Sequence, residues 1–145
     1  MYGITGFYNR RGITIDDPLT ILTGMNNSLV HRGPDRSDTW IDKDSGIYFA
    51  HRRLSILDLT LEGDQPMISS SGRFIIIFNG EIYNHLALMK EINNKKWRGS
   101  SDTETILAVI EFYGLEKALT RLKGMFAFSL WDRKLQRLTL ARDRL

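Results

Sequence analysis

The apolar residues of this chain follow two spacings. In some segments they alternate with polar residues, and in others they recur at helical spacing. The helical spacing predicts helices over residues 18–30, 84–93, 102–113 and 115–122. Strand-like runs cover residues 4–8, 39–41, 47–57, 73–78, 125–132 and 138–143. Because the strands come in groups rather than in strict alternation with helices, the pattern predicts a layered α+β fold and not a doubly wound sheet.

Several helix ends carry clear local signals. Asp17-Pro18 predicts a helix start, with the carboxylate as N-cap and proline in the first turn. Ser101 and Glu104 have the spacing of a capping box, in which the two side chains bond each other's backbone N–H groups. Gly114 follows the apolar stripe of the same helix and predicts its C-terminal end.

Two short segments predict breaks in regular structure. His31–Asp35 contains adjacent glycine and proline, which interrupt both helices and strands. Asn79-Gly80 follows an almost continuously apolar strand and is a strong turn signal. The apolar run before it, 73–78, predicts a central strand covered on both faces.

Length and composition describe an ordinary globular domain. The chain has 145 residues, which suits one domain, with 42% apolar and 26% charged residues and a net charge of +3. This modest charge gives no reason to expect nucleic acid or an acidic membrane as partner. The absence of cysteine excludes disulfides and thiolate metal sites and makes cytoplasm the expected location. The three histidines, His31, His51 and His85, do not have the spacing of metal ligands.

Six segments in fixed order closely resemble the glutaminase domain of glutamine-hydrolysing asparagine synthetases. These enzymes are class II amidotransferases of the N-terminal-nucleophile hydrolase family. Any one segment is too short to be specific, but together they span nearly the whole chain. The segments are His31–Asp35, His51–Asp58, Phe78–Asn84, Gly99–Glu104, Gly124–Phe128 and Ala141–Asp143.

The resemblance implies a four-layer αββα sandwich and a pocket for L-glutamine. Arg53 matches the residue that binds the α-carboxylate, a task suited to a forked guanidinium. Asp102 matches the residue that receives the α-ammonium, and the helix N-terminus is expected to help keep it ionised. Asn79 and Gly80 match an oxyanion hole made of a side-chain amide and a backbone N–H. The remaining residues implied in the pocket lining are Leu54, Ile56, Leu57 and Glu81.

Each assignment has a structural alternative. Arg53 could be a surface arginine on an exposed strand. Asn79-Gly80 could be only a turn, and Asp102 only a capping residue. Taken one residue at a time, these structural alternatives are favoured, and only the full set of segments favours the glutamine pocket.

Tyr2 occupies the position at which the resemblance implies a nucleophilic cysteine. In the family, this cysteine becomes the first residue, its thiolate attacks the glutamine amide, and its α-amine is the general base. A phenol, with an unperturbed pKa of about 10, supplies little anion at neutral pH. A bulky second residue is also expected to keep Met1 attached, which displaces the amine. The sequence therefore predicts a domain that does not hydrolyse glutamine.

Two further departures accompany Tyr2. Arg52 stands where family members often have glutamate. The chain also stops near Asp143, where the family continues, so we expect a partial domain (1–145) without its synthetase domain. The resemblance places ATP and magnesium in that domain and no cofactor or metal in this one. Missing final strands would leave sheet edges open to self-association.

The leading hypothesis is an inactive glutaminase-type domain whose parent protein forms amides from free ammonia. One alternative is a regulatory or scaffold module that still binds glutamine. Another is an active enzyme altered at residue 2. A domain of a β-lactam synthetase-like enzyme is the last alternative.

Overall fold

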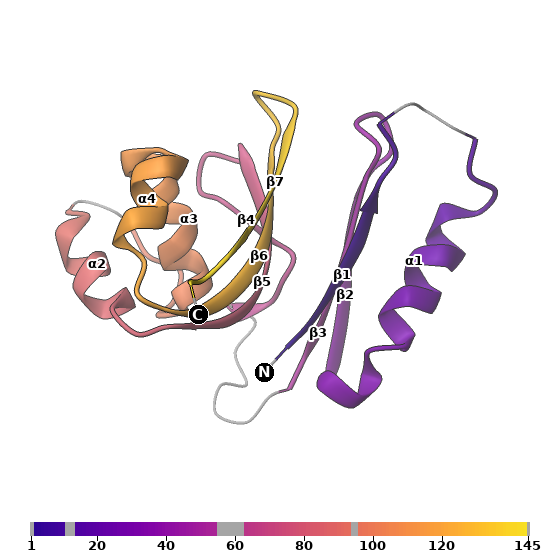
Figure 1. Cartoon of the computed structure of the whole chain (residues 1–145), viewed down its shortest axis with the longest axis horizontal. Coiled ribbons are helices and arrows are strands. Elements are labelled where there is room, and N and C mark those ends of the chain that lie inside the picture. Colours follow the sequence, from indigo (N-terminus) through magenta and orange to yellow (C-terminus); the bar gives the residue numbers. More distant parts are fainter. Residues whose placement is uncertain (1, 11–13, 55–62, 94–95, 145) are drawn as a thin grey trace.

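The computed structural model describes residues 2–10, 14–54, 63–93 and 96–144 of the chain. Its strands form two antiparallel sheets that face each other, and helices cover the outer face of each sheet (Figure 1). The predicted α+β class and the layered αββα arrangement are therefore confirmed. Figure 1 also places the N-terminus between the two sheets at one end of the sandwich.

The smaller sheet has three strands in the order β1-β3-β2 and carries one helix on its outer face. Its period-two pattern separates two environments along β3. Ile47 and Phe49 pack between the sheets, whereas Tyr48 and Ala50 pack with Leu22 of the helix. The elements are β1 (Gly3–Tyr8), α1 (Pro18–Asn27), β2 (Arg36–Asp42) and β3 (Ile47–Arg53).

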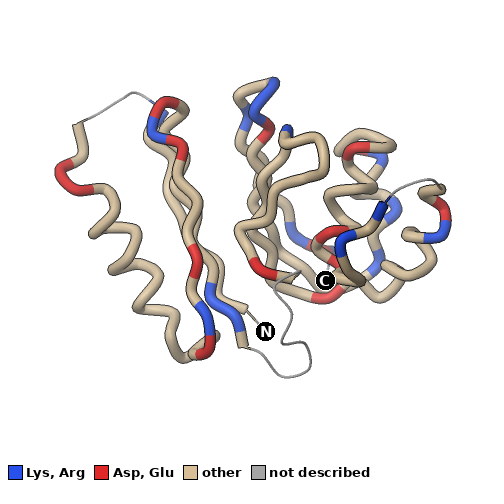
Figure 2. Tube along the Cα trace, turned by 180° about the vertical axis from the view of Figure 1, so that it is seen from behind, with Lys and Arg blue, Asp and Glu red and all other residues tan. Residues whose placement is uncertain are grey.

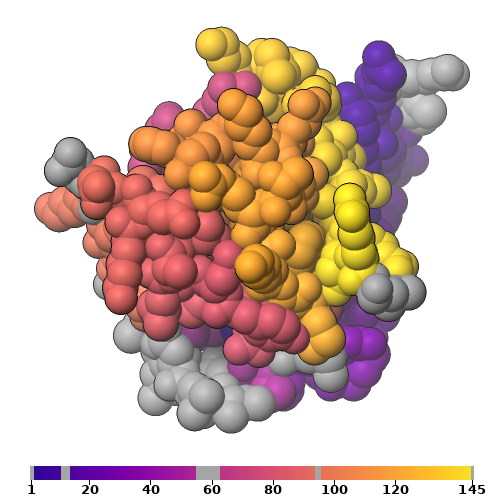
Figure 3. Space-filling model, turned by 60° about the vertical axis from the view of Figure 1, so that its left-hand side comes forward, coloured from indigo at the N-terminus to yellow at the C-terminus, as the bar shows by residue number. Residues whose placement is uncertain are grey.

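The larger sheet has the order β4-β5-β6-β7, and three helices lie on its outer face. Figure 3 shows these helices forming one continuous surface. Phe78 and Ile82 of β5 pack beneath the helices, whereas Ile75 and Ile77 pack with Trp131 between the sheets. The elements are β4 (Met67–Ile68), β5 (Phe74–Ile82), α2 (His85–Glu91), α3 (Asp102–Tyr113), α4 (Leu115–Arg121), β6 (Gly124–Asp132) and β7 (Arg137–Arg142).

The predicted helix starts at Asp17 and Ser101 are confirmed, but only half of the capping box predicted for Ser101 and Glu104 forms. The Asp17 side chain accepts the N–H of Thr20 at 3.2 Å, with proline in the first turn of α1. Ser101 accepts the N–H of Glu104 at 3.2 Å. The Glu104 carboxylate, however, accepts backbone N–H groups before the helix rather than the one at Ser101. It therefore fastens the preceding loop to α3.

Several predicted elements differ from the structure, including the strand expected over 39–41, which spans Arg36–Asp42. The helix expected over 18–30 ends at Asn27, and a short 3-10 helix, Val30–Arg32, follows it inside a region expected to be irregular. The two-residue strand β4 was not predicted, because it is too short to show a period. The turn expected at Asn79-Gly80 is absent, since β5 continues to Ile82 in register with β6.

The surface carries charges of both signs on both halves of the sandwich (Figure 2). No helix in the described part of the chain is both long and apolar enough to cross a bilayer. Lys and Arg residues occupy the end of the three-stranded sheet nearest the N-terminus (Figure 2). The candidate site lies at this end.

Candidate functional site

The period of the strands brings four of the expected site residues to one end of the sandwich, together with His51. Alternate residues of a strand share one face, so positions two and four residues beyond the core between the sheets point into the same space. Five polar or aromatic residues continue the inner faces in this way at one end of the sandwich. They are Tyr2 before β1, His51 and Arg53 on β3, and Asn79 and Glu81 on β5.

A hydrogen bond joins the expected nucleophile position to the expected oxyanion donor. The backbone N–H of Tyr2 donates to Oδ1 of Asn79 at 2.8 Å, across 77 residues of sequence. Because Oδ1 accepts this bond, the Nδ2 group is the donor end of the half-buried Asn79 side chain. An amide held in this way can donate to a developing negative oxygen, as an oxyanion hole requires.

Gly80 is required by the packing of the two central strands. Its φ is +150°, and an added Cβ would lie 2.1 Å from the carbonyl oxygen of Met125 and 2.6 Å from Cα of Phe126. The interpretation of Asn79-Gly80 as only a turn is wrong, because both residues pair within the β5–β6 ladder. Close approach of β6 explains the glycine, and the ladder fixes Asn79 next to it.

Arg53 is a buried arginine with an internal carboxylate partner. Its side chain is 7% exposed, so the interpretation as a surface arginine is wrong. Nη1 of Arg53 lies 2.6 Å from Oδ1 of Asp64, and Nη1 of Arg36 lies 2.7 Å from the other oxygen of Asp64. One carboxylate thus bridges two guanidinium groups, which leaves this cluster with a net charge of +1.

Asp102 is the first residue of α3, and its carboxylate reaches the neighbouring sheet. Oδ2 accepts the backbone N–H of Ile82 at 3.1 Å, while the N-cap role belongs to Ser101. The capping alternative for Asp102 is therefore wrong. Burial raises the pKa of Asp102 above its ordinary value, against the lowering effects of the Ile82 N–H and of the electrostatic interaction with His85. The helix N-terminus was expected to keep Asp102 ionised by lowering its pKa, but the effect of burial is larger.

Gln65 connects the two elements that carry Asn79 and Asp102. Its Oε1 accepts the N–H of Phe78 at 2.5 Å, and its Nε2 donates to Oγ1 of Thr103 at 3.2 Å. The side chain is buried. Each partner is the chain neighbour of an expected site residue, so Gln65 sets the spacing between strand β5 and the start of α3.

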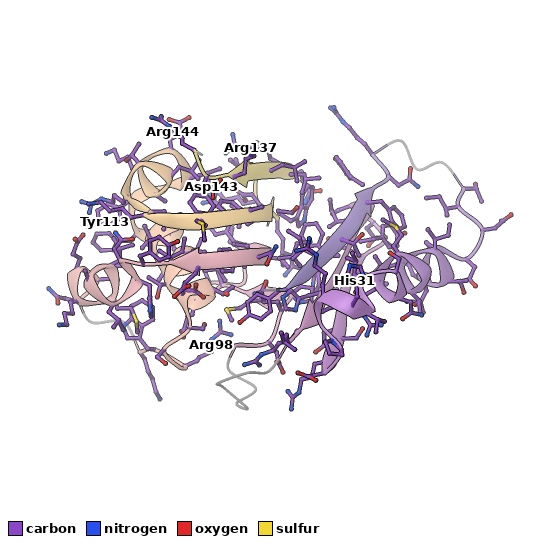
Figure 4. All side chains as sticks on the ribbon, turned by 60° about the horizontal axis from the view of Figure 1, so that its bottom comes forward. His31, Arg98, Tyr113, Arg137, Asp143 and Arg144 are labelled. Atoms are coloured by element: carbon purple, nitrogen blue, oxygen red, sulfur yellow. The ribbon has the colours of Figure 1, made fainter. Side chains whose placement is uncertain are left out.

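Glu104 holds the loop that leads into α3. Its two carboxylate oxygens accept the N–H groups of Arg98 and Gly99, each at 3.0 Å. Figure 4 shows Arg98 on the larger sheet's half of the sandwich, away from His31 on the other half. Glu104 was predicted as a helix cap, and the structure extends that role to the segment just before Asp102.

His51 is a buried, neutral histidine beside Tyr2. Its ring centroid lies 5.2 Å from that of Tyr2. Burial and the nearby charge of Arg53 lower the pKa of His51 to about 4, with the carboxylate of Asp64 opposing them. Within the described residues, Nε2 of His51 has no hydrogen-bond partner. No group of three or more acidic, histidine or cysteine side chains among these residues is placed to hold a metal ion.

The remaining expected residues lie at the margin of this site. Leu54 is half-buried just after β3, and Glu81 is exposed on β5. Ile56 and Leu57 lie outside the described residues. Arg52, the departure noted in the sequence, points to the other face of β3: its Nε donates to the carbonyl of Asn26 at 2.9 Å and so holds the end of α1.

Sequence reasoning missed Asp64, Gln65 and the packing role of His51. Asp64 and Gln65 lie in a segment without a period, and their partners are 11 to 38 residues away in the chain. No local pattern could have found these contacts. The period of β3 did contain a signal for His51, since it follows Phe49 on the inner face.

The arrangement has the chemistry to hold a small amino acid. Arg53 lies in a positively charged cluster, Asp102 is a partly buried carboxylate, and Asn79 presents an amide donor. These groups complement a carboxylate, an ammonium group and a polar carbonyl, in that order. The inner end of the sandwich is thus a candidate binding site for an amino-acid amide.

Comparison with known proteins identifies the family of this chain. A family profile described as "Glutamine amidotransferase domain" matches residues 1–145. "Asparagine synthetase [glutamine-hydrolyzing] 1" of Bacillus subtilis (strain 168) is 39% identical over 146 residues, which cover 99% of this chain and 22% of that protein. "Amidase chry2" of Gibberella zeae is 34% identical over 153 residues, covering 99% of this chain and 23% of the relative. The chain thus spans less than a quarter of the length of these relatives.

A solved structure shares the fold. It is the glutamine phosphoribosylpyrophosphate amidotransferase from B. subtilis, complexed with ADP and GMP, with a TM-score of 0.55 and 23% identity. The match covers 68% of this chain and 23% of that one. The chain therefore belongs to the glutamine amidotransferase domain family, homologous to glutamine-hydrolysing asparagine synthetases.

Proposed function

We propose that this domain binds L-glutamine at the inner end of the sandwich and does not hydrolyse it. The observation that carries this proposal is the hydrogen bond between the Tyr2 N–H and Asn79 Oδ1. It aligns residue 2 with the amide donor, while residue 2 itself brings a phenol packed against His51. Arg53 would bind the α-carboxylate and Asp102 the α-ammonium group of the ligand.

Loss of hydrolysis follows from the chemistry of residue 2. The chain contains no cysteine, so no thiolate can attack the amide carbon. A phenol with an ordinary pKa of about 10 is almost entirely protonated at pH 7. Where Met1 stays attached, the Tyr2 nitrogen is a peptide N–H with no basic lone pair. Both the nucleophile and its general base are then missing.

Calorimetry and an ammonia assay test the two halves of this proposal separately. We expect saturable heat on titration with L-glutamine, and ammonia release no faster than that of Tyr2→Ala. Asn79→Ala should weaken glutamine binding by roughly tenfold, the effect of losing one good hydrogen bond to the ligand. Ammonia release by purified wild-type protein above the Tyr2→Ala rate would contradict the loss of activity.

Two results would favour the alternatives. The absence of any heat with L-glutamine would favour a scaffold role. Ammonia release by Tyr2→Cys, with removal of Met1 checked by mass spectrometry, would favour an enzyme altered only at residue 2. No change in Tyr2→Cys would favour a site that has lost its activity more widely.

The role of the whole protein is a broader proposal. The relatives' names describe glutamine-hydrolysing asparagine synthetases, and we propose that the parent protein joins this domain to an amide-forming synthetase domain that uses free ammonia. ATP and magnesium in that domain and a cytoplasmic location stay predictions.

We also propose that the domain self-associates through the open side of the sandwich. Among the described residues, β1 pairs only with β3 and β7 pairs only with β6, so each presents a free edge. A groove of about 380 Å³ runs between these edges and is lined mainly by residues of β1 and β7, including Ile4, Tyr8 and Leu138. Leu140, which also lines it, is 72% exposed. Exposed apolar edges of this kind favour strand pairing with a second copy.

Light scattering tests this association. We expect a concentration-dependent dimer for the wild-type chain, and a dissociation constant about tenfold higher for Leu140→Lys, because a charge would be buried at the edge. Leu135→Lys is the matched control, since Leu135 is 53% exposed in the turn between β6 and β7. A monomer at high protein concentration, or equal effects of both substitutions, would contradict the proposal.

A further inference from the structure

The Asp64 carboxylate forms an ion pair with Arg53, as the carboxylate of a ligand would. One oxygen of Asp64 lies 2.6 Å from Nη1 of Arg53, and the other lies 2.7 Å from Nη1 of Arg36. We propose that Asp64 is an internal competitor that sets how tightly this domain binds ligands with an α-carboxylate. This inference rests on the proposed glutamine site.

Burial makes the competition direct. The Arg53 side chain is 7% exposed, and a buried guanidinium needs a carboxylate partner because an unpaired buried charge is strongly unfavourable. A ligand carboxylate and the Asp64 carboxylate offer Arg53 the same charge and the same acceptor geometry. Binding of the ligand therefore exchanges one carboxylate for another and does not add a partner to an unsatisfied cation.

Arg36 makes this exchange feasible. Its side chain is 42% exposed, and that of Asp64 is 23% exposed, so this pair lies at the solvent side of the cluster. When Asp64 leaves Arg53, its second oxygen keeps the Arg36 partner. The displaced carboxylate then remains paired and close to water.

The backbone next to Asp64 can stay in place during this exchange. Gln65 is anchored through its side chain to the Phe78 N–H and the Thr103 hydroxyl. Rotation of the Asp64 side chain would therefore release Nη1 of Arg53 without moving the backbone at Gln65. The contacts that set the spacing of Asn79 and Asp102 do not have to change.

A purely positioning role for Asp64 predicts the opposite result. If Asp64 only held Arg53 in place, removal of its charge would misplace the guanidinium and weaken binding of L-glutamine. Competition predicts tighter binding, and only for ligands that have an α-carboxylate. The sign of the change and its dependence on the ligand separate these roles.

The test compares L-glutamine with 4-aminobutanamide, which has the same amide and amine but lacks the α-carboxylate. We expect Asp64→Asn to bind L-glutamine about tenfold more tightly than wild type, the size of one hydrogen bond to a charged group. Its affinity for 4-aminobutanamide should not change. Asp64→Glu, which restores the carboxylate, should return the affinity for L-glutamine toward the wild-type value.

Asp44→Asn is the matched control, because it removes the same charge from an exposed residue between β2 and β3. Urea unfolding of each variant checks that it is folded. Weaker binding of L-glutamine by folded Asp64→Asn, or an equal gain for both ligands, would overturn the inference and leave the proposed function standing. Binding by Asp64→Asn but not by wild type would support competition. Failure of every variant to bind L-glutamine would overturn both.

Discussion

Lowering the pH from 7 to 4 is expected to remove about 3 kcal/mol of unfolding free energy through His51 alone. The pKa of His51 falls from 6.5 to about 4 on folding, chiefly because the ring is buried. The native histidine therefore binds a proton less readily than the unfolded one. Stability that is fully present above pH 6.5 is lost as the pH falls through 6.5 toward 4.

The neighbours of His51 explain why the shift is large. The Tyr2 ring packs against it, the positive charge of Arg53 lowers its pKa further, and the carboxylate of Asp64 opposes the shift. Asp102 acts in the opposite direction on stability. Because its folded pKa is raised, protonation at acid pH relieves an unfavourable buried charge. The pH dependence of the unfolding free energy thus adds the opposing contributions of His51 and Asp102. A comparison of variants is needed to isolate the contribution of His51.

Urea unfolding of wild type and His51→Gln between pH 7 and pH 4.5 makes that comparison. The variant has no imidazole to protonate, so we expect its stability to fall less steeply as the pH is lowered. His31→Gln is the control, because His31 is exposed on the 3-10 helix after α1 (Figure 4). Parallel curves for wild type and His51→Gln would show that His51 does not titrate as a buried group.

The parts of this fold that depend on a regular period could be predicted from the sequence. The inner and outer faces of β3 follow directly from alternation, which also places Arg53 on the same face as Ile47 and Phe49. Helix starts at Asp17 and Ser101 were predicted because a cap contacts residues only three positions away. These signals are local, so tertiary structure did not need to be known.

Features that depend on contacts across the fold could not be predicted. The turn expected at Asn79-Gly80 fails because β6 pairs with both residues and holds them extended. The Asp64–Arg53 pair and the two bonds of Gln65 depend on where an irregular segment lies against the sheets. The resemblance supplied the expected role of Arg53, but not the carboxylate that occupies it.

Replacement of Gly80 by alanine should give the other large effect, a loss of about 3 kcal/mol of unfolding free energy. The new methyl would meet the backbone of β6, 2.1 Å from the Met125 oxygen, and backbone atoms cannot move aside as a side chain can. Such overpacking costs roughly 1–3 kcal/mol. The positive φ of +150° adds strain for any residue with a Cβ, about 1–2 kcal/mol. Relief requires β5 and β6 to separate next to Asn79, so binding of L-glutamine should weaken as well.

Gly72→Ala separates the clash from the strain. Gly72 also has a positive φ, +75°, but nothing lies within 4 Å of an added Cβ. We therefore expect Gly72→Ala to cost only the backbone strain, about 1–2 kcal/mol, and to leave glutamine binding unchanged. Urea unfolding and calorimetry on both variants make the comparison. Equal stability losses would mean that β6 does not constrain Gly80, and that the oxyanion donor at Asn79 is not held by the pairing of these two strands.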